Sequence, residues 1–333
     1  MTPSRIRRNW RAAAVATVAL AGIALTGCAN SETPAGGNDA ERLHIGVFIP
    51  ANSNAYLQAE ETAAEQVAED LGIDVTVITS DWDSQAQNAA FELAKQRGTY
   101  DAWVVNAISP AEQCDTILDA AESGIPVIIA VTAICGDDGY TEGTIAFVGE
   151  QNRAGYDKWF EHINANSSNG ELAVITGPAL DFVTNTTTAA AEAALPSTNG
   201  LELASVQNTD YLTETAYAAA QTFLQSNPKL VAIASNYSGM TRGVVEAVEQ
   251  SGKDVTVYDS NGDSWTKEQI EAGAIAAALP GMPFTDIRLS LESLVAHLNG
   301  EEVETVINPL DSLTFPGAPI ITADNVAEWT PEY

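Results

Sequence analysis

Residues 102–131 read AWVVNAISPAEQCDTILDAAESGIPVIIAV, and this stretch decides the fold. It contains two short runs rich in Val and Ile, 102–106 and 125–131, which is typical of strands buried on both faces. Between them, residues 110–123 carry apolar side chains at helical spacing, and Gly124 follows where a left-handed cap is expected. The stretch therefore predicts a strand–helix–strand unit with parallel strands in a sheet covered by helices.

The same alternation extends to both sides of this unit. Further strands are expected at 43–49, 74–80, 145–149, 171–177, 201–207, 230–235, 254–260 and 274–279. The expected helices between them are 55–71, 84–97, 152–165, 185–195, 213–226, 238–251, 265–272 and 284–299, with a short final helix near 324–329. Two successive α/β halves of similar size are predicted, each with a parallel sheet. Ligands bind outside the carboxyl ends of such strands, so a cleft between the halves is the expected site.

The N-terminal pattern is typical of an export signal. Four arginines in the first eleven residues precede an apolar run, 12–25, that is too short to span a hydrocarbon core. The run ends in Leu25-Thr26-Gly27-Cys28, which resembles the bacterial lipobox, in which Cys28 becomes the lipidated first residue. We expect 1–27 to be a lipoprotein signal peptide, 28–42 a flexible tether, and the protein to be anchored to the cell membrane outside the cytoplasm. An ordinary signal with a chance cysteine is the alternative.

The chain is strongly acidic. Four of its fourteen Lys and Arg residues lie in the signal, which leaves ten against forty-five Asp and Glu. Nucleic acids and anionic headgroups are bound by clusters of Lys and Arg, so no nucleic-acid partner is expected. The acidity favours solubility and does not identify the ligand.

Two further cysteines, Cys114 and Cys135, are expected in a compartment where disulfides persist. Both fall at the same end of neighbouring predicted strands, so a bridge between them is geometrically possible. Two separate buried thiols are the alternative.

Several short motifs occur in a recognisable order over the chain: Gly46-Val47-Phe48-Ile49-Pro50 with Asn54 and Tyr56, Ala107-Ile108-Ser109-Pro110, Gly124-Ile125-Pro126-Val127, Phe147-Val148-Gly149 with Asn152, Asn227-Pro228, and Ile270-Glu271-Ala272-Gly273. Their order and spacing, from about residue 43 to 329, resemble the type I periplasmic-binding-protein family. Within it, the ribose- and galactose-type solute receptors of ABC importers are the most similar.

The resemblance implies two Rossmann-like, doubly wound parallel-sheet domains joined by three crossovers. The first lobe would comprise 43–148 plus 278–308, and the second 149–277 plus 309–330. The implied function is capture of a small-molecule solute by hinge closure, followed by delivery to an ABC transporter permease. Such a protein is expected to be a monomer without a cofactor and without enzymatic activity.

The chain departs from the family where charged groups grip sugar hydroxyls. No Arg lies near 185–188, Asn261 stands where a strand-end Asp is usual, Gly281 replaces a hinge Gln, and Thr132 falls near a usual Asp. Neutral groups at these positions predict a neutral polar solute, such as a sugar or polyol, rather than an anion, which would need a bidentate Arg. A cationic amine held by cation–π contact is the alternative ligand.

The candidate ligand residues are amide, hydroxyl, carboxylate and large apolar side chains at strand ends and at the hinge. They are Asn52, Asn54, Tyr56, Trp82, Asp83, Asn106, Ser109, Thr132, Phe182, Thr184, Asn185, Asn236, Tyr237, Asn261, Asp263 and Met282. For each of the Asn, Asp and Ser residues, a turn or a helix cap is the alternative role.

Other chemistry finds little support in the sequence. His44, His162 and His297 lie far apart, so we expect structural roles and no zinc site. There is no nucleophile–base constellation and no phosphate loop. Asp259-x-Asn261-x-Asp263 imitates the opening of a calcium loop, but Ser264 and Ile270 stand where Gly and Glu are needed. A sensory receptor that signals to a membrane kinase is the alternative function, because it uses the same fold.

Overall fold

The computed structural model describes residues 42–179, 181–196 and 200–333, which form two six-stranded sheets. The predicted signal peptide, the lipidation residue Cys28 and all of the predicted tether except its last residue lie outside the described residues. None of the helices within those described ranges combines the length and apolarity needed to cross a bilayer.

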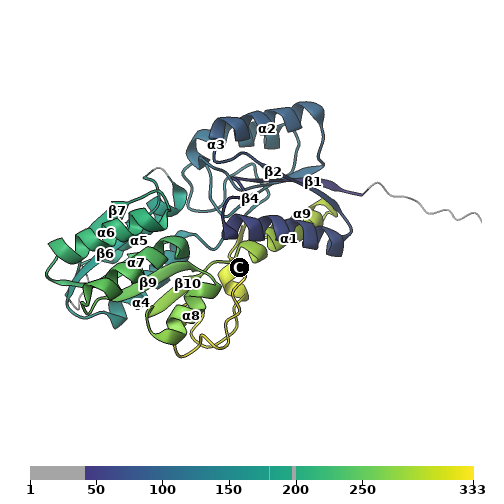
Figure 1. Ribbon diagram of the computed structural model, residues 1–333. Helices are drawn as coiled ribbons and strands as arrows, with labels where there is room; N and C mark the ends of the chain where they lie inside the picture. The colour runs from purple at the N-terminus through teal and green to yellow at the C-terminus, as the bar shows by residue number, and fades with distance from the viewer. Residues whose placement is uncertain (1–41, 180, 197–199) are drawn as a thin grey trace, which may run out of the picture. The chain divides into compact units, whose positions relative to one another are not determined.

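The first sheet has the strand order β11-β5-β4-β3-β1-β2, and all its pairings are parallel. Helices α1 (Ala55–Leu71) and α9 (Pro283–Leu298) cover one face, and α2 (Ser84–Arg97) and α3 (Pro110–Glu122) cover the other (Figure 1). The strands are β1 (His44–Ile49), β2 (Asp74–Thr79), β3 (Ala102–Val105), β4 (Val127–Ala130), β5 (Ala146–Val148) and β11 (Val306–Ile307). We call this sheet with its helices the first lobe.

The second sheet has the order β12-β10-β9-β8-β6-β7 and is parallel except for β12, which pairs antiparallel with β10. Helices α4 (Arg153–Asn166) and α5 (Phe182–Ala194) pack on one face, and α6 (Thr213–Ser226) and α7 (Ser238–Ser251) on the other. The remaining elements are β6 (Gly170–Thr176), β7 (Leu201–Asn208), β8 (Leu230–Ser235), β9 (Thr256–Gly262), α8 (Ser264–Ala272), β10 (Ala277–Pro280), the 3-10 turn η1 (Pro309–Ser312) and β12 (Ile321–Thr322). We call this sheet with its helices the second lobe.

Side-chain alternation along the strands builds a core on both faces of each sheet. In β1, Ile45 and Val47 face α1 and α9, whereas Phe48 packs with Trp103 on the opposite face. All four side chains are at most 1% exposed, so this central part of the sheet is buried on both sides. The parallel α/β architecture predicted from the sequence is confirmed.

Several boundaries differ from the prediction. Helix α5 begins at Phe182 and not at 185, because the Asp181 carboxylate accepts a hydrogen bond from the Thr184 N–H and caps the helix. The final helix expected near 324–329 is absent, and residues 323–328 form turns instead. The Asn325 side chain holds these turns by donating to the carbonyls of Pro316 and Ile320.

The chain crosses between the sheets after β5, after β10 and after β11. We retain the division into two lobes as a proposal, with one change at the second crossing. Residues 278–280 were assigned to the first lobe, but β10 pairs with β9 in the second sheet. The crossing therefore lies at Gly281–Met282, immediately before α9.

Candidate functional site

In both lobes, the predicted solute residues lie at or just beyond the carboxyl ends of parallel strands. Asn106 follows β3 and Thr132 follows β4, while Asn236 follows β8 and Asn261 lies at the end of β9. Phe182, Thr184 and Asn185 belong to the first turn of α5 rather than to a loop. This is the edge where α/β sheets bind ligands.

The first-lobe residues at this edge are bonded to one another. Asn106 Nδ2 donates to Glu60 Oε1 over 2.9 Å, and Thr132 Oγ1 approaches Asn106 Oδ1 at 3.3 Å and the Ala107 carbonyl at 3.2 Å. All three residues Glu60, Asn106 and Thr132 are buried. The structure thus brings Asn106 and Thr132 together, with much of their hydrogen-bonding capacity used internally.

A buried pair of glutamines braces the loop that contains Asn106. Gln87 Nε2 donates to the Asn106 carbonyl, and Gln87 Oε1 accepts from the Ile108 N–H at 3.0 Å and from Gln113 Nε2 at 2.9 Å. Gln113 Oε1 in turn accepts from the Ser109 N–H at 2.7 Å. Neither glutamine is among the residues predicted from the sequence, although Gln87 lies one turn before the buried Phe91 on the same face of α2.

Some candidate residues serve as helix caps, the alternative that the sequence left open. Asn54, Asp83 and Asp263 accept hydrogen bonds from the first turns of α1, α2 and α8. Ser109 precedes α3 and donates its hydroxyl to Glu112. Of the remaining loop residues, Asn52 and Asn185 are exposed, and Trp82 is 48% exposed, with its indole N–H on Ser53 Oγ.

In the second lobe, the candidate solute residues themselves include buried polar atoms without partners. Within the described residues, Asn236 Oδ1 and Thr184 Oγ1 are buried and accept or donate no hydrogen bond. Asp181 and Tyr211 lie close to Thr184, but neither meets hydrogen-bond geometry with its hydroxyl. Asn261 has a left-handed backbone, with φ of 55°, and its Nδ2 donates to the Asn236 carbonyl at 3.3 Å. Unpartnered buried polar atoms are rare and call for a ligand or water.

Two aromatic candidates border this group. Tyr237 is half-buried and packs edge-to-face on Tyr211, with ring centroids 5.8 Å apart. Phe182 is partly buried and contacts the apolar cores of both lobes. Phe182 therefore touches the first lobe from the second.

The sequence analysis did not anticipate a cation near Asp263. Arg242, on α7, donates from a guanidinium nitrogen to Asp263 Oδ2 at 2.5 Å, and its guanidinium carbon lies 4.5 Å from the centroid of the Trp265 ring. Asp263 also caps α8. Both the charge and the acceptor capacity of this carboxylate are thus largely used within the protein.

Asp259 does not begin a calcium loop. Its two oxygens accept from Thr241 Oγ1 at 2.5 Å and Thr266 Oγ1 at 2.6 Å, and burial raises its pKa to about 7. Across residues 42–179, 181–196 and 200–333, no three His, Cys, Asp or Glu side chains are grouped so that they could hold a metal ion.

Tyr56 and Met282 belong to the hinge. The Tyr56 hydroxyl lies 3.0 Å from Glu150 Oε1 and 3.1 Å from Asp286 Oδ2, and the Met282 N–H donates to the same Glu150 oxygen. Glu150 follows β5 and Asp286 lies in the first turn of α9, so the cluster joins two of the three crossings. The phenol of Tyr56 is therefore committed to the hinge rather than turned to a solute.

The single phenol hydrogen of this hinge cluster faces two carboxylates, and a protonated carboxyl would satisfy the second contact. Burial, followed by the charge of Glu150, raises the pKa of Asp286 well above its usual range, and burial does the same for Glu60. One oxygen on each of Glu60, Glu150 and Asp286 is buried without a partner among the described residues.

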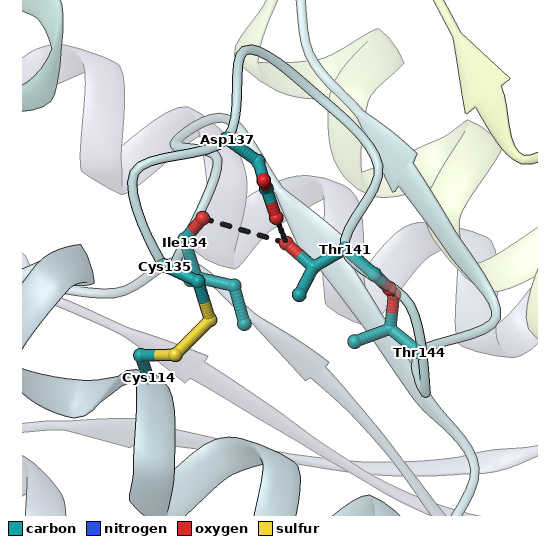
Figure 2. The surroundings of a disulfide bond; sticks show 6 residues. All are labelled: Cys114, Ile134, Cys135, Asp137, Thr141 and Thr144. Atoms are coloured by element: carbon teal, nitrogen blue, oxygen red, sulfur yellow. Dashed lines mark hydrogen bonds between the residues drawn. A yellow bond between two sulfur atoms is a disulfide. The ribbon is translucent and has the colours of Figure 1, made fainter.

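Cys114 and Cys135 form a disulfide, with an S–S distance of 2.04 Å (Figure 2). Of the two possibilities that the sequence left open, the structure contains the bridge. It ties α3 to the loop after β4, where Thr141 Oγ1 donates to Asp137 at 2.7 Å. The bridge thus restrains the segment that begins with Thr132.

Two surface hollows lie elsewhere on the second lobe. One, of about 710 Å³, is bordered by His162, Tyr258 and Thr322, and the other, of about 510 Å³, by Asn208 and Phe223. None of the candidate solute residues lines either hollow. The candidate site therefore rests on the strand-end residues and their unpartnered atoms.

Known proteins with similar sequences are import binding proteins. The ribose import binding protein RbsB of Bacillus subtilis is 21% identical over 276 residues, which cover 83% of this chain and 88% of that protein. The D-apiose import binding protein of Actinobacillus succinogenes is 21% identical over 244 residues, covering 73% and 77%.

Solved structures share the fold. A carbohydrate transporter solute-binding protein from Agrobacterium radiobacter, in complex with D-arabinose, matches with a TM-score of 0.75 at 19% identity and covers 87% of this chain and 97% of its own. A Bacillus halodurans protein with bound myo-inositol matches with a TM-score of 0.73 at 22% identity, covering 89% and 100%. The family description "Periplasmic binding protein domain" matches residues 45–302. The chain therefore belongs to the periplasmic binding protein family.

Proposed function

We propose that this protein is an extracytoplasmic, lipid-anchored solute-binding protein of an ABC importer. It captures a neutral polar solute, a sugar or polyol, between its two lobes and releases it to a membrane permease. The hinge closes because the solute contacts both lobes only in the closed arrangement, which shifts the population toward that arrangement.

The observation that carries the choice of solute is the unpartnered amide oxygen of Asn236. It is buried beside Asn261, and Asn236 Nδ2 donates to Thr187 Oγ1 on α5, the helix that also carries the unpartnered hydroxyl of Thr184; all of these groups are uncharged. A hydroxyl-rich solute would satisfy an amide oxygen and a threonine hydroxyl without adding charge. Arg242, the cation nearby, is already paired with Asp263, which disfavours an anionic solute.

The relatives support the same class of solute. The curated relatives are named for ribose and D-apiose, and the solved structures hold D-arabinose, D-allose or myo-inositol. These ligands are polyhydroxylated and uncharged. At about 20% identity, the relatives support the class and not one particular sugar.

A thermal-shift screen tests this proposal. Purified protein lacking residues 1–28 is scanned with pentoses, hexoses, inositols, quaternary amines, nucleosides and organic acids. A solute at about one hundred times its Kd should stabilise the native state by about 2.7 kcal/mol and raise the melting temperature. Stabilisation by sugars or polyols supports the proposal. Stabilisation by organic acids or amines alone would overturn the neutral solute.

The anchor and the partner need separate tests. In a lipoprotein-processing host, the wild type should incorporate labelled palmitate, whereas Cys28→Ala should not and should leave the membrane fraction. A wild type without label would refute the anchor. Permease and ATPase genes beside this gene would support import, whereas a membrane kinase gene in their place would favour a sensory receptor.

A further inference from the structure

The last two residues of the chain, Glu332 and Tyr333, contact both lobes across the hinge. On the first-lobe side, the Glu332 carboxylate accepts from the Thr285 N–H at 3.0 Å and from Thr285 Oγ1 at 2.5 Å, at the start of α9. On the second-lobe side, the Tyr333 backbone oxygen accepts from the Ser264 N–H at 2.9 Å and from Ser264 Oγ at 2.7 Å. Figure 1 marks this end of the chain beside α1, α9 and β10.

The Tyr333 side chain lies over the second crossing. Its ring packs edge-to-face on Tyr56, with centroids 5.6 Å apart, and contacts the first-lobe core. A Cβ at position 281 would stand 2.9 Å from both the ring edge and the hydroxyl of Tyr333. Gly281 therefore leaves the space that this ring occupies, and any larger residue there would displace it.

The Tyr333 hydroxyl reaches the candidate solute residues of the second lobe. It donates to the Asn261 carbonyl at 2.6 Å, at the residue with the left-handed backbone. Burial and then the charge of Asp263 raise the pKa of Tyr333 well above its ordinary value, so the hydroxyl remains a donor at neutral pH. The charge of Tyr237 adds to the same rise in the pKa of Tyr333.

We propose that Glu332–Tyr333 is a strap across the hinge and that Tyr333 forms the hinge-side wall of the solute site. The inference rests on the proposed function and extends it to a residue outside the strand-end loops. Through its bond to Asn261, Tyr333 positions the neighbouring polar groups, and through its ring it limits the size of the solute. The strap contacts both lobes and therefore affects the equilibrium between their open and closed arrangements. Solute binding shifts the same equilibrium.

The test compares Tyr333→Phe, Tyr333→Ala and Glu332→Gln with the wild type by calorimetric titration of D-ribose, D-arabinose and myo-inositol. Loss of one hydrogen bond should weaken binding roughly three- to tenfold in Tyr333→Phe. Loss of the aromatic wall in Tyr333→Ala should weaken binding on the order of tenfold or more and change the ratio of affinities among the three probes. Tyr217→Phe is the matched control, because the Tyr217 hydroxyl bonds Gln250 of α7 and Gln221 of α6, neither of which is a candidate solute residue.

Small-angle scattering of the solute-free protein tests the strap separately, because the radius of gyration does not depend on which solute is bound. Tyr333→Ala and Glu332→Gln should have a larger radius of gyration than the wild type and Tyr217→Phe. Folded variants with wild-type scattering and wild-type affinity ratios would overturn the inference. A wild type that binds none of the three probes nor any other sugar or polyol would count against the proposed function, and the scattering would still decide for or against the strap.

Discussion

The strand-end amide and hydroxyl groups of the two lobes differ in how they are bonded, although Glu60 Oε2 and Trp103 Nε1 in the first lobe also lack partners within the described residues. In the first lobe, Asn106, Thr132 and Gln87 bond to one another and to the loop backbone, so their geometry is fixed before any solute arrives. In the second lobe, Asn236 Oδ1 and Thr184 Oγ1 are equally buried but have no partner within the described residues. A polar atom that is buried without a partner costs about 1–3 kcal/mol.

This difference predicts different roles for the strand-end residues of the two lobes. A satisfied network stabilises its lobe and gains little from a solute, whereas an unsatisfied pair weakens its lobe and gains a partner on binding. Substitutions in the first lobe should therefore act mainly on stability, and substitutions in the second mainly on affinity. The following predictions test this contrast.

A change of pH should have the largest effect on the free energy of unfolding, because carboxyls are buried in the second lobe and at the hinge. Asp259 in the second lobe and Asp286 at the hinge have native pKa values above their unfolded values, so the native state holds more protons and its stability falls as pH rises. Each extra proton costs at most about 1.4 kcal/mol per pH unit, which amounts to on the order of 4 kcal/mol between pH 5 and 8. Urea unfolding at each pH measures this loss.

The two carboxyls can be separated by substitution. Asp259→Asn should flatten the stability profile between about pH 4 and 7, the interval between its unfolded and native pKa. Asp286→Asn should flatten the profile further into the alkaline range. Profiles with unchanged slopes would mean that these groups do not titrate on unfolding.

The next effect concerns the first-lobe brace. Gln87→Ala removes the partner of the Asn106 carbonyl and of the Ile108 N–H, whereas Gln113 Nε2 keeps the Ser84 carbonyl and Asn88 Oδ1 at 3.4 Å. We expect a loss of about 3 kcal/mol in the free energy of unfolding, measured with urea. Gln85→Ala, an exposed position on the same helix, is the control and should change little. Equal losses in the two variants would contradict the assigned role of Gln87.

Affinity should depend most on Asn236. Asn236→Ala removes the unpartnered amide oxygen, and we expect solute binding to weaken about tenfold to a hundredfold, since a site built for hydrogen bonds discriminates by such factors. Calorimetric titration with the best solute from the screen measures this change. Gln225→Ala, an exposed amide on α6, should bind like the wild type. If Asn236→Ala bound the solute with wild-type affinity, Asn236 would not be a solute-binding residue.

The smallest expected effects are changes in stability caused by two Thr→Val substitutions, one in each lobe. These changes should differ in direction between the lobes. Thr132→Val loses a hydroxyl with acceptors at Asn106 and Ala107 and should destabilise the protein by about 1 kcal/mol. Thr184→Val replaces an unpartnered buried hydroxyl with a methyl group and should be neutral or stabilising, while it weakens solute binding. Thermal unfolding compares the two. If Thr184→Val lost as much stability as Thr132→Val, the proposed difference between the two lobes would be wrong.

Much of the fold could be predicted because its signals are local. Helices α1 and α2 begin and end where Asn54, Asp83, Gly72 and Gly98 place their caps, and the predicted ranges 55–71 and 84–97 match the structure. Shorter elements escaped prediction, since β11 and β12 have two residues each and are strands only through their neighbours. The predicted family membership is confirmed, whereas the candidate solute residues stay predictions.

The alternating strands and helices could be read from the sequence alone, since hydrophobic periodicity and capping residues act over a few positions. The resemblance to the periplasmic binding protein family came from the order and spacing of short motifs. Only the tertiary structure decided which polar side chains remain unpartnered, that Tyr56 turns to Glu150 and Asp286, and that Tyr333 reaches Asn261. These contacts join residues up to 230 positions apart. A side chain's partner across such a distance depends on how whole elements pack, which no local pattern encodes.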